Sequence, residues 1–101
     1  MTNRLDFHEV LCSILGSRNV YYQPPESVKM KYPAIVYSRN DINNTFADDA
    51  VYKQDNSYEV IIIDKDPDSI IVDKVASFPR SRFNRHYVAD NLNHDVFTIY
   101  Y

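Results

Sequence analysis

Three carboxylates stand two residues apart, at Asp64, Asp66 and Asp68, in the segment D-K-D-P-D-S-I-I-V-D-K. An EF-hand calcium loop begins with this spacing, and it then needs glycine at its sixth position and glutamate at its twelfth. Those two positions hold Ser69 and Val75. The segment therefore predicts a structural junction, with weak cation binding as the alternative.

The junction that these residues favour is the start of a helix. Asp66 is a suitable N-cap, and Pro67 fits the first helical position, where no backbone N–H is missed. Asp68 suits the positive end of the helix dipole, as does Ser69. Pro79 then ends the pattern. Apolar residues recur at helical spacing before it, at Ile71, Val75 and Phe78.

Basic and aromatic residues alternate in the segment R-S-R-F-N-R-H-Y, which spans residues 80–87. In a nucleic-acid-binding protein such a pattern pairs phosphate contacts with base stacking. The chain has a net charge of −3, however, and arginine is also the favoured cation of protein interfaces. We therefore expect a solvated or inter-subunit charge patch, and a small nuclease or nucleic-acid-binding factor is the alternative. That alternative would use Arg82, Arg85, His86 and His94.

Two other sets of residues could be drawn as metal or acid–base sites. The first is His86, His94, Asp90 and Asp95. Their spacing on a predicted strand and turn does not force them together, so we expect no ligand or catalytic role. The second is His8 with Cys12, which supplies only two ligands. Because Cys12 borders an apolar helix face, a buried structural thiol is expected.

Composition excludes several classes of function. Glycine occurs once, so neither a phosphate-cradling loop nor a G-x-S-x-G nucleophile elbow can be written. Cysteine also occurs once, which excludes an intrachain disulfide and a cysteine-based zinc site. No apolar run is long enough to span a bilayer, and the N-terminal segment carries charges where a signal peptide is apolar. We expect a cytoplasmic protein that is no enzyme and uses no cofactor or metal.

The elements that position these residues follow from hydrophobic periodicity. One strand is apolar on both faces and should be central, because Tyr58, Val60 and Ile62 alternate with Ile61 and Ile63. The polar stretch before it is expected to be a loop or a hairpin arm. The 101 residues form one domain of α+β class, with a mixed, mainly antiparallel sheet in the order α-β-β-β-α-β-β. The predicted ranges are helix 2–16, strands 19–23 (at an edge or a terminus), 34–38 and 58–64, helix 67–78, and strands 83–89 and 95–101, with a turn at 90–94.

The chain has nine tyrosines. Tyrosine combines a large contact area with a polar tip and is enriched at interfaces, although it also serves in sheets and cores. Candidate interface residues are Tyr21, Tyr22, Arg80, Arg82, Arg85, Tyr100 and Tyr101.

An ordered series of sequence blocks resembles the small tail-completion or tail-terminator proteins of tailed bacteriophages and prophages. The blocks are Y-P-A-I-V-Y, F-A-D-D-A-V-Y, Y-E-V-I-I-I-D-K-D-P-D-S and R-H-Y-V-A-D-N-L-N-H-D-V-F-T-I-Y-Y, and the likeness extends from about Val20 to Tyr101. It carries over no active-site residue.

The resemblance implies a non-enzymatic α+β virion subunit that forms a ring, commonly a hexamer. Such a ring sits at the head-proximal end of the tail tube, contacts the tail tube protein and a head-completion or neck protein, and lets DNA pass without specific binding. The implied location is the tail–neck junction of the virion, after assembly in the host bacterial cytoplasm. The composition is compatible, because two short helices cannot easily cover both faces of an apolar sheet.

Overall fold

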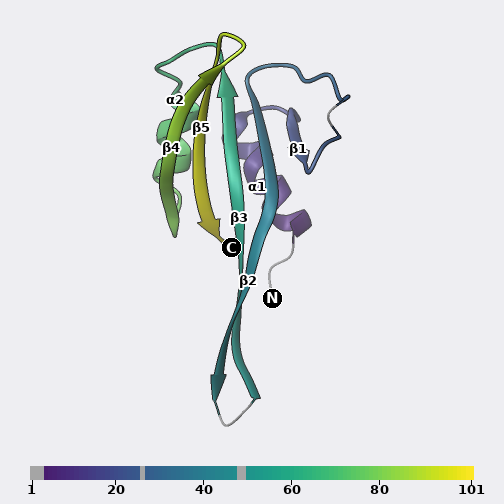
Figure 1. Ribbon diagram of the computed structural model, residues 1–101, viewed down its shortest axis with the longest axis vertical. Coiled ribbons are helices and arrows are strands. Elements are labelled where there is room, and N and C mark those ends of the chain that lie inside the picture. The colour runs from purple at the N-terminus through teal and green to yellow at the C-terminus, as the bar shows by residue number, and fades with distance from the viewer. Residues whose placement is uncertain (1–3, 26, 48–49) are drawn as a thin grey trace.

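The computed structural model describes residues 4–25, 27–47 and 50–101, with side chains described for 4–25, 27–39 and 57–101. Two helices and a five-stranded sheet follow one another in the order α-β-β-β-α-β-β, which confirms the predicted α+β class (Figure 1). The elements are α1 (Arg4–Leu15), β1 (Val20–Tyr22), β2 (Ala34–Ala47), β3 (Ala50–Asp64), α2 (Ile70–Ala76), β4 (Ser81–Ala89) and β5 (Leu92–Tyr100).

The strands lie in the order β1-β2-β3-β5-β4. Only β1 with β2 is a parallel pair, and the other three pairs are antiparallel. The prediction of a central strand is confirmed, since β3 lies in the middle of the sheet, and β1 is at an edge, one of the two positions expected of it. Both helices lie behind the sheet in Figure 1, on the same face. In the described part of the chain, no helix is long and apolar enough to cross a membrane.

Helix α1 presents an apolar face to the sheet and ends at Gly16. Phe7, Leu11 and Cys12 are buried. Gly16 has φ +81°, and its N–H donates to the Cys12 carbonyl at 2.9 Å. Right-handed helices commonly end with a residue in the left-handed conformation, which has a positive φ and is usually glycine. The predicted helix end is therefore confirmed, whereas its predicted start at Thr2 lies outside the described residues.

The hydrophobic core fills the space between the helices and one sheet face. Phe7 stacks on Tyr58 with ring centroids 4.7 Å apart, and it meets the edge of Tyr37 at 5.6 Å. Helix α2 adds Ile71 and Val75 to this core. The sheet contributes Val20, Ile35, Tyr37, Tyr58, Val60, Ile62, Phe97 and Ile99.

Strands β2 and β3 continue beyond the body as a two-stranded hairpin (Figure 1). Their pairing runs without a third strand from Ile42↔Asn56 to Ala47↔Ala50, apart from a register shift after Thr45. The molecule consequently measures 51 × 25 × 23 Å. The polar stretch after Ser38 is thus a hairpin arm, one of the two structures expected of it.

The turn between β4 and β5 is tighter than the predicted reversal over residues 90–94. Asp90 and Asn91 have φ +53° and +61°. Positive φ at both central residues is typical of a two-residue type I′ hairpin turn, and Asp and Asn tolerate it. Strand β5 therefore begins at Leu92, three residues before its predicted start.

The start of α2 also corrects a prediction, because its N-cap is Ser69 and not Asp66. The Ser69 hydroxyl accepts the Ile71 N–H at 3.3 Å. Asp64 and Asp66 instead accept the N–H groups two residues ahead, at 3.0 and 2.9 Å. Such short-range bonds to aspartate compete with helix formation. The carboxylates hold a turn, and the helix starts after it.

Replacing the observed cap should therefore destabilise the protein. We expect Ser69→Ala to lower the free energy of unfolding by about 1 kcal/mol, because the Ile71 N–H loses its acceptor. Ser69→Asp keeps an acceptor and serves as the matched control. Urea denaturation followed by circular dichroism measures both. A Ser69→Ala variant as stable as the wild type would show that the cap contributes nothing.

His8 is held in a hydrogen-bonded chain at the edge of the core. Its Nδ1 lies 2.8 Å from the Tyr37 hydroxyl, which also accepts from Arg4 Nη1 at 3.5 Å. The Tyr37 proton is thus free to be donated to an unprotonated Nδ1. Burial, with a smaller effect from the charge of Arg18, lowers the pKa of His8 from its ordinary 6.5. The fold favours neutral His8.

This arrangement predicts a loss of stability in mild acid. As the pH falls below the unfolded pKa of 6.5, the unfolded chain takes up a proton that folded His8 resists. Stability should fall until the lowered folded pKa is reached. Thermal unfolding of wild type and His8→Gln between neutral pH and about 5.5 tests this, since the other histidines are present in both. Equal pH slopes would contradict the prediction.

Candidate interaction surface

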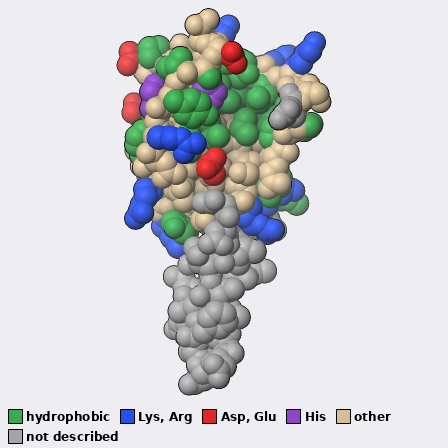
Figure 2. All heavy atoms as spheres, viewed as in Figure 1, with side chains coloured by type: hydrophobic (Ala, Val, Ile, Leu, Met, Phe, Trp, Pro, Cys, Tyr) green, Lys and Arg blue, Asp and Glu red, His purple; other side chains and the backbone are tan. Residues whose placement is uncertain are grey.

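The sheet face opposite the helices, here called the open sheet face, is built from cross-strand rows. A central row crosses all five strands, as the pairs Tyr21↔Val36, Val36↔Ile61, Ile61↔Val96 and Arg85↔Val96 show. On one side of it lies the row Ala34, Ile63, His94 and Tyr87, and on the other the row Ser38, Glu59, Thr98 and Arg82. Figure 2 views this face and shows hydrophobic side chains gathered over the sheet.

The middle of the open sheet face is apolar and its β4 side is basic. Val36 and Ile61 are partly exposed, whereas Val96 between Ile61 and Arg85 is buried. Arg82 and Arg85 are exposed. Apolar side chains surrounded by polar and charged ones are typical of a protein contact surface.

The open sheet face carries most of the candidate interface residues. Tyr21, Arg82 and Arg85 belong to its rows. Tyr100 follows Thr98 on the same side of β5, and the Arg80 guanidinium lies 5.6 Å from the Tyr100 ring centroid. The structure thus brings five of the seven candidates to one side of the sheet. Their role in an interface stays a prediction.

The other two candidates, Tyr22 and Tyr101, face the helices. Tyr22 lies 4.9 Å from Tyr37 between ring centroids, with the Arg4 guanidinium 4.4 Å from its own centroid. Tyr101 lies 4.9 Å from Phe7. Both therefore extend the core, because strand alternation places neighbouring residues on opposite faces.

An aromatic stack on the open sheet face was not anticipated from the sequence. Tyr87 and His94 have ring centroids 4.6 Å apart and an interplanar angle of 11°. His94 Nδ1 lies 3.0 Å from the Leu92 carbonyl, so Nδ1 carries the proton and Nε2 is the acceptor in the neutral ring. The sequence signal that could have predicted this stack is the turn, because a two-residue turn at Asp90 and Asn91 places Tyr87 opposite His94.

The structure divides the histidine and aspartate set that could have formed a metal or acid–base site. His86 Nδ1 lies 2.8 Å from Asp95 Oδ1 on the helix side of the sheet, whereas His94 is on the open sheet face and Asp90 lies in the turn. Among the residues with described side chains, no cluster of three or more His, Cys, Asp or Glu could hold a metal ion. The four proposed nuclease residues are likewise split, since only His86 faces the helices.

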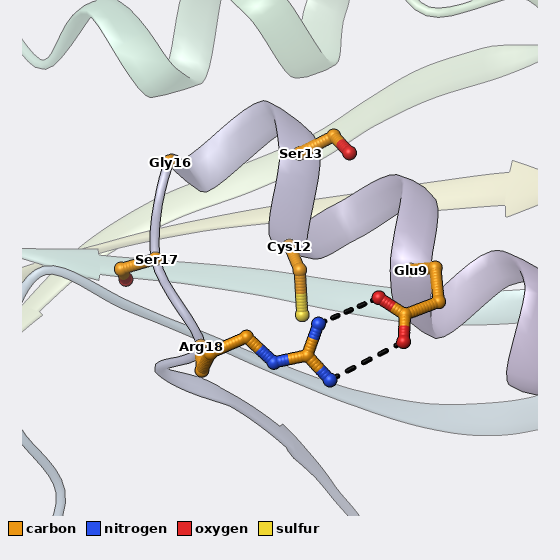
Figure 3. Close-up of a pocket in the computed structure, with 6 residues that line it drawn as sticks. All are labelled: Glu9, Cys12, Ser13, Gly16, Ser17 and Arg18. Carbon is orange, nitrogen blue, oxygen red and sulfur yellow. Dashed lines mark hydrogen bonds and ion pairs between the residues drawn. The ribbon is translucent and has the colours of Figure 1, made fainter.

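A pocket at the end of α1 is lined in part by Cys12, the single cysteine of the sequence (Figure 3). Its walls are Glu9, Cys12, Ser13, Gly16, Ser17 and Arg18. The Arg18 guanidinium holds both Glu9 carboxylate oxygens, at 2.6 and 3.3 Å, and this hydrogen bonding lowers the pKa of Glu9. Cys12 is buried, and burial raises the pKa of its thiol. A buried, protonated thiol is a poor nucleophile, as expected of a structural cysteine.

No protein-family model matches this chain, and no curated protein sequence matches it.

The acidic triplet should not act as a calcium site, because the Asp64 and Asp66 carboxylates already accept backbone N–H groups. We expect millimolar calcium to leave the thermal unfolding temperature unchanged and titration calorimetry to detect no binding. An equal concentration of magnesium is the control for ionic strength. Micromolar calcium binding that disappears in Asp66→Ala would contradict this prediction.

Proposed function

We propose that this protein is a non-enzymatic assembly subunit of a tailed bacteriophage or prophage. Its copies close into a ring, with a hexamer as the proposed size, at the head-proximal end of the tail tube. The ring completes the tail and joins it to the neck. The observation that carries the proposal is the open sheet face, where the apolar residues Val36, Ile61 and Val96 lie side by side and neither described helix covers them.

The open sheet face suits contact with another copy. Burying Val36, Ile61 and Tyr87 against a neighbour removes apolar surface from water. Each Å² of apolar surface that is buried stabilises the contact by about 25 cal/mol. The neighbour must use a different patch, because a ring requires heterologous contacts. The row is asymmetric, with Tyr21 at one edge and Arg85 at the other, which fits a directional contact.

The two-stranded pairing of the hairpin arm also supports an assembly role. A two-stranded antiparallel ribbon is marginally stable in water unless something packs against it. Here β2 and β3 run well beyond the body as such a ribbon (Figure 1). An arm of this length reaches past the subunit that carries it, which suits contact with an adjacent subunit.

The placement at the tail rests on the likeness of the sequence blocks to tail-completion proteins. It supplies the proposed partners, which are the tail tube protein and a head-completion or neck protein, and the location at the tail–neck junction. The net charge of −3 is compatible with a conduit, because an acidic wall does not retain passing phosphates.

The nuclease alternative has less support. Its four residues lie on two faces of the sheet. The pair that does form joins His86 of the basic strand β4 to Asp95 of β5, and among the described side chains it belongs to no cluster of three or more possible metal ligands. Cleavage of DNA or RNA by the purified protein that is lost in His86→Ala would favour it.

The assembly proposal is tested in the phage or prophage that carries the gene. Deletion should leave DNA-filled heads and unattached tails by electron microscopy, and purified wild-type protein should restore joining in an extract. Ile61→Lys and Val36→Lys should each reduce joining by roughly tenfold or more, because a charge is forced into the apolar contact.

The matched control is Ile70→Lys, which makes the same change at an exposed position on α2, away from the open sheet face. It should restore joining like the wild type, with folding of every variant checked by circular dichroism. Infectious particles from the deletion strain would defeat the proposal, as would mature virions in which mass spectrometry finds no copy of this chain.

A further inference from the structure

We propose that β4 is a docking strand for an extended, acidic segment of a partner protein, which adds beside it as a new edge of the sheet. This goes beyond the proposed ring, because it concerns a partner other than a second copy. It uses the outer edge and the arginines of β4, whereas the ring contact is centred on Val36 and Ile61 in the middle of the open sheet face.

Strand β4 is attached to the rest of the molecule mainly along one side. It is the last strand of the sheet and pairs only with β5 among the described strands. Every residue of β4 after Ser81 is exposed. An edge strand turns alternate N–H and C=O groups outward, and these can pair with an added strand. Strand β4 is nine residues long, so its alternate residues would offer these groups to an added strand.

The helix side of β4 offers apolar contacts to an added strand. Phe83 is 53% exposed and Val88 is 62% exposed. The Phe83 ring is held against the core by Phe97, edge to face at 5.4 Å, so its exposed part is presented in a fixed orientation. Apolar side chains on an added strand would lie beside these two residues, as cross-strand neighbours do.

The open side of β4 determines the charge of the partner. Arg82 and Arg85 are exposed there, and their cross-strand neighbours on β5 are the uncharged Thr98 and Val96. The strand itself contains no carboxylate. The nearest acidic position in these rows is Glu59, one strand further in, opposite Thr98. Aspartate or glutamate on the added strand would complement the two arginines.

The same residues disfavour pairing of β4 with β4 of another copy. Such a pair would bring arginines together, and charged residues are a recognised protection of sheet edges. A nucleic acid partner is disfavoured by the net charge of −3. The edge therefore selects an acidic peptide.

A labelled peptide tests this directly. The probe is a fluorescein-labelled nonapeptide of alternating glutamate and valine, matched to the nine residues of β4, and binding is followed by fluorescence anisotropy with the full-length protein. It should bind roughly tenfold more tightly than a matched control nonapeptide of alternating lysine and valine, here called the lysine–valine peptide. It should also bind more tightly than a glutamate–valine peptide with two central prolines, which cannot complete the backbone pairing.

Variants of the protein separate charge from backbone pairing. Arg82→Glu with Arg85→Glu should reverse the preference toward the lysine peptide, and Phe83→Ser should weaken both peptides. Lys74→Glu, an exposed charge reversal on α2, is the matched control and should change nothing. Ile61→Lys should leave peptide binding intact, so that failure of the ring and failure of the docking strand are told apart.

Several results would overturn the proposal. If the glutamate–valine peptide with prolines bound equally well, charge attraction without backbone pairing would explain the binding. Tighter binding of a fluorescein-labelled oligothymidylate would assign the surface to nucleic acid. A dimer of the free protein that is abolished by Phe83→Ser would assign the edge to a second copy. Hydrogen exchange of the β4 amides that is unchanged by the acidic peptide would also contradict strand addition.

Discussion

The packing of the Phe7 ring against three tyrosines is the interaction on which the rest of the structure depends. Its ring is fully buried and contacts Tyr37 of β2, Tyr58 of β3 and Tyr101 at the end of the chain, with centroid distances of 5.6, 4.7 and 4.9 Å. One helix residue thereby fixes α1 against three segments that are far apart in sequence. Offset and edge-to-face ring contacts of this kind are directional, so they set where the helix lies as well as how firmly.

With α1 fixed in this position, both described helices lie on the same face of the sheet. Helix α2 is only seven residues long, and it extends the same core through Ile71 and Val75. A sheet with apolar residues on both faces then keeps one face without a second layer. This imbalance leaves partly exposed apolar side chains such as Val36 and Ile61 on the open sheet face.

The two ends of the sheet differ in what they present. At one end β1 is three residues long, and the following segment returns to it, since the Lys31 N–H lies 3.5 Å from the Tyr21 hydroxyl. At the other end β4 is long and exposed. The molecule therefore has a short edge beside a connecting segment and a long accessible edge. Such asymmetry is what directional contacts between unlike surfaces require.

The sequence by itself determined the class, the order of the elements and the central strand, because these depend on short-range periodicity and on stop signals such as Gly16. It also showed that Asp64, Asp66 and Asp68 belong to a junction. It misplaced the cap, since Asp66 and Ser69 are both good N-caps and only the competing turn decides between them. Local signals of equal strength are settled by the structure around them.

Tertiary structure alone decided which face each residue occupies and which face is covered. Tyr21 and Tyr22 look alike in the sequence, yet one lies on the open sheet face and the other packs on Tyr37. The pairs His86–Asp95 and Tyr87–His94 depend on register, and a turn at Asp90 and Asn91 shorter than expected changes every partner across β4 and β5. Register and layer assignment arise from contacts between distant segments, and no pattern within one segment contains them.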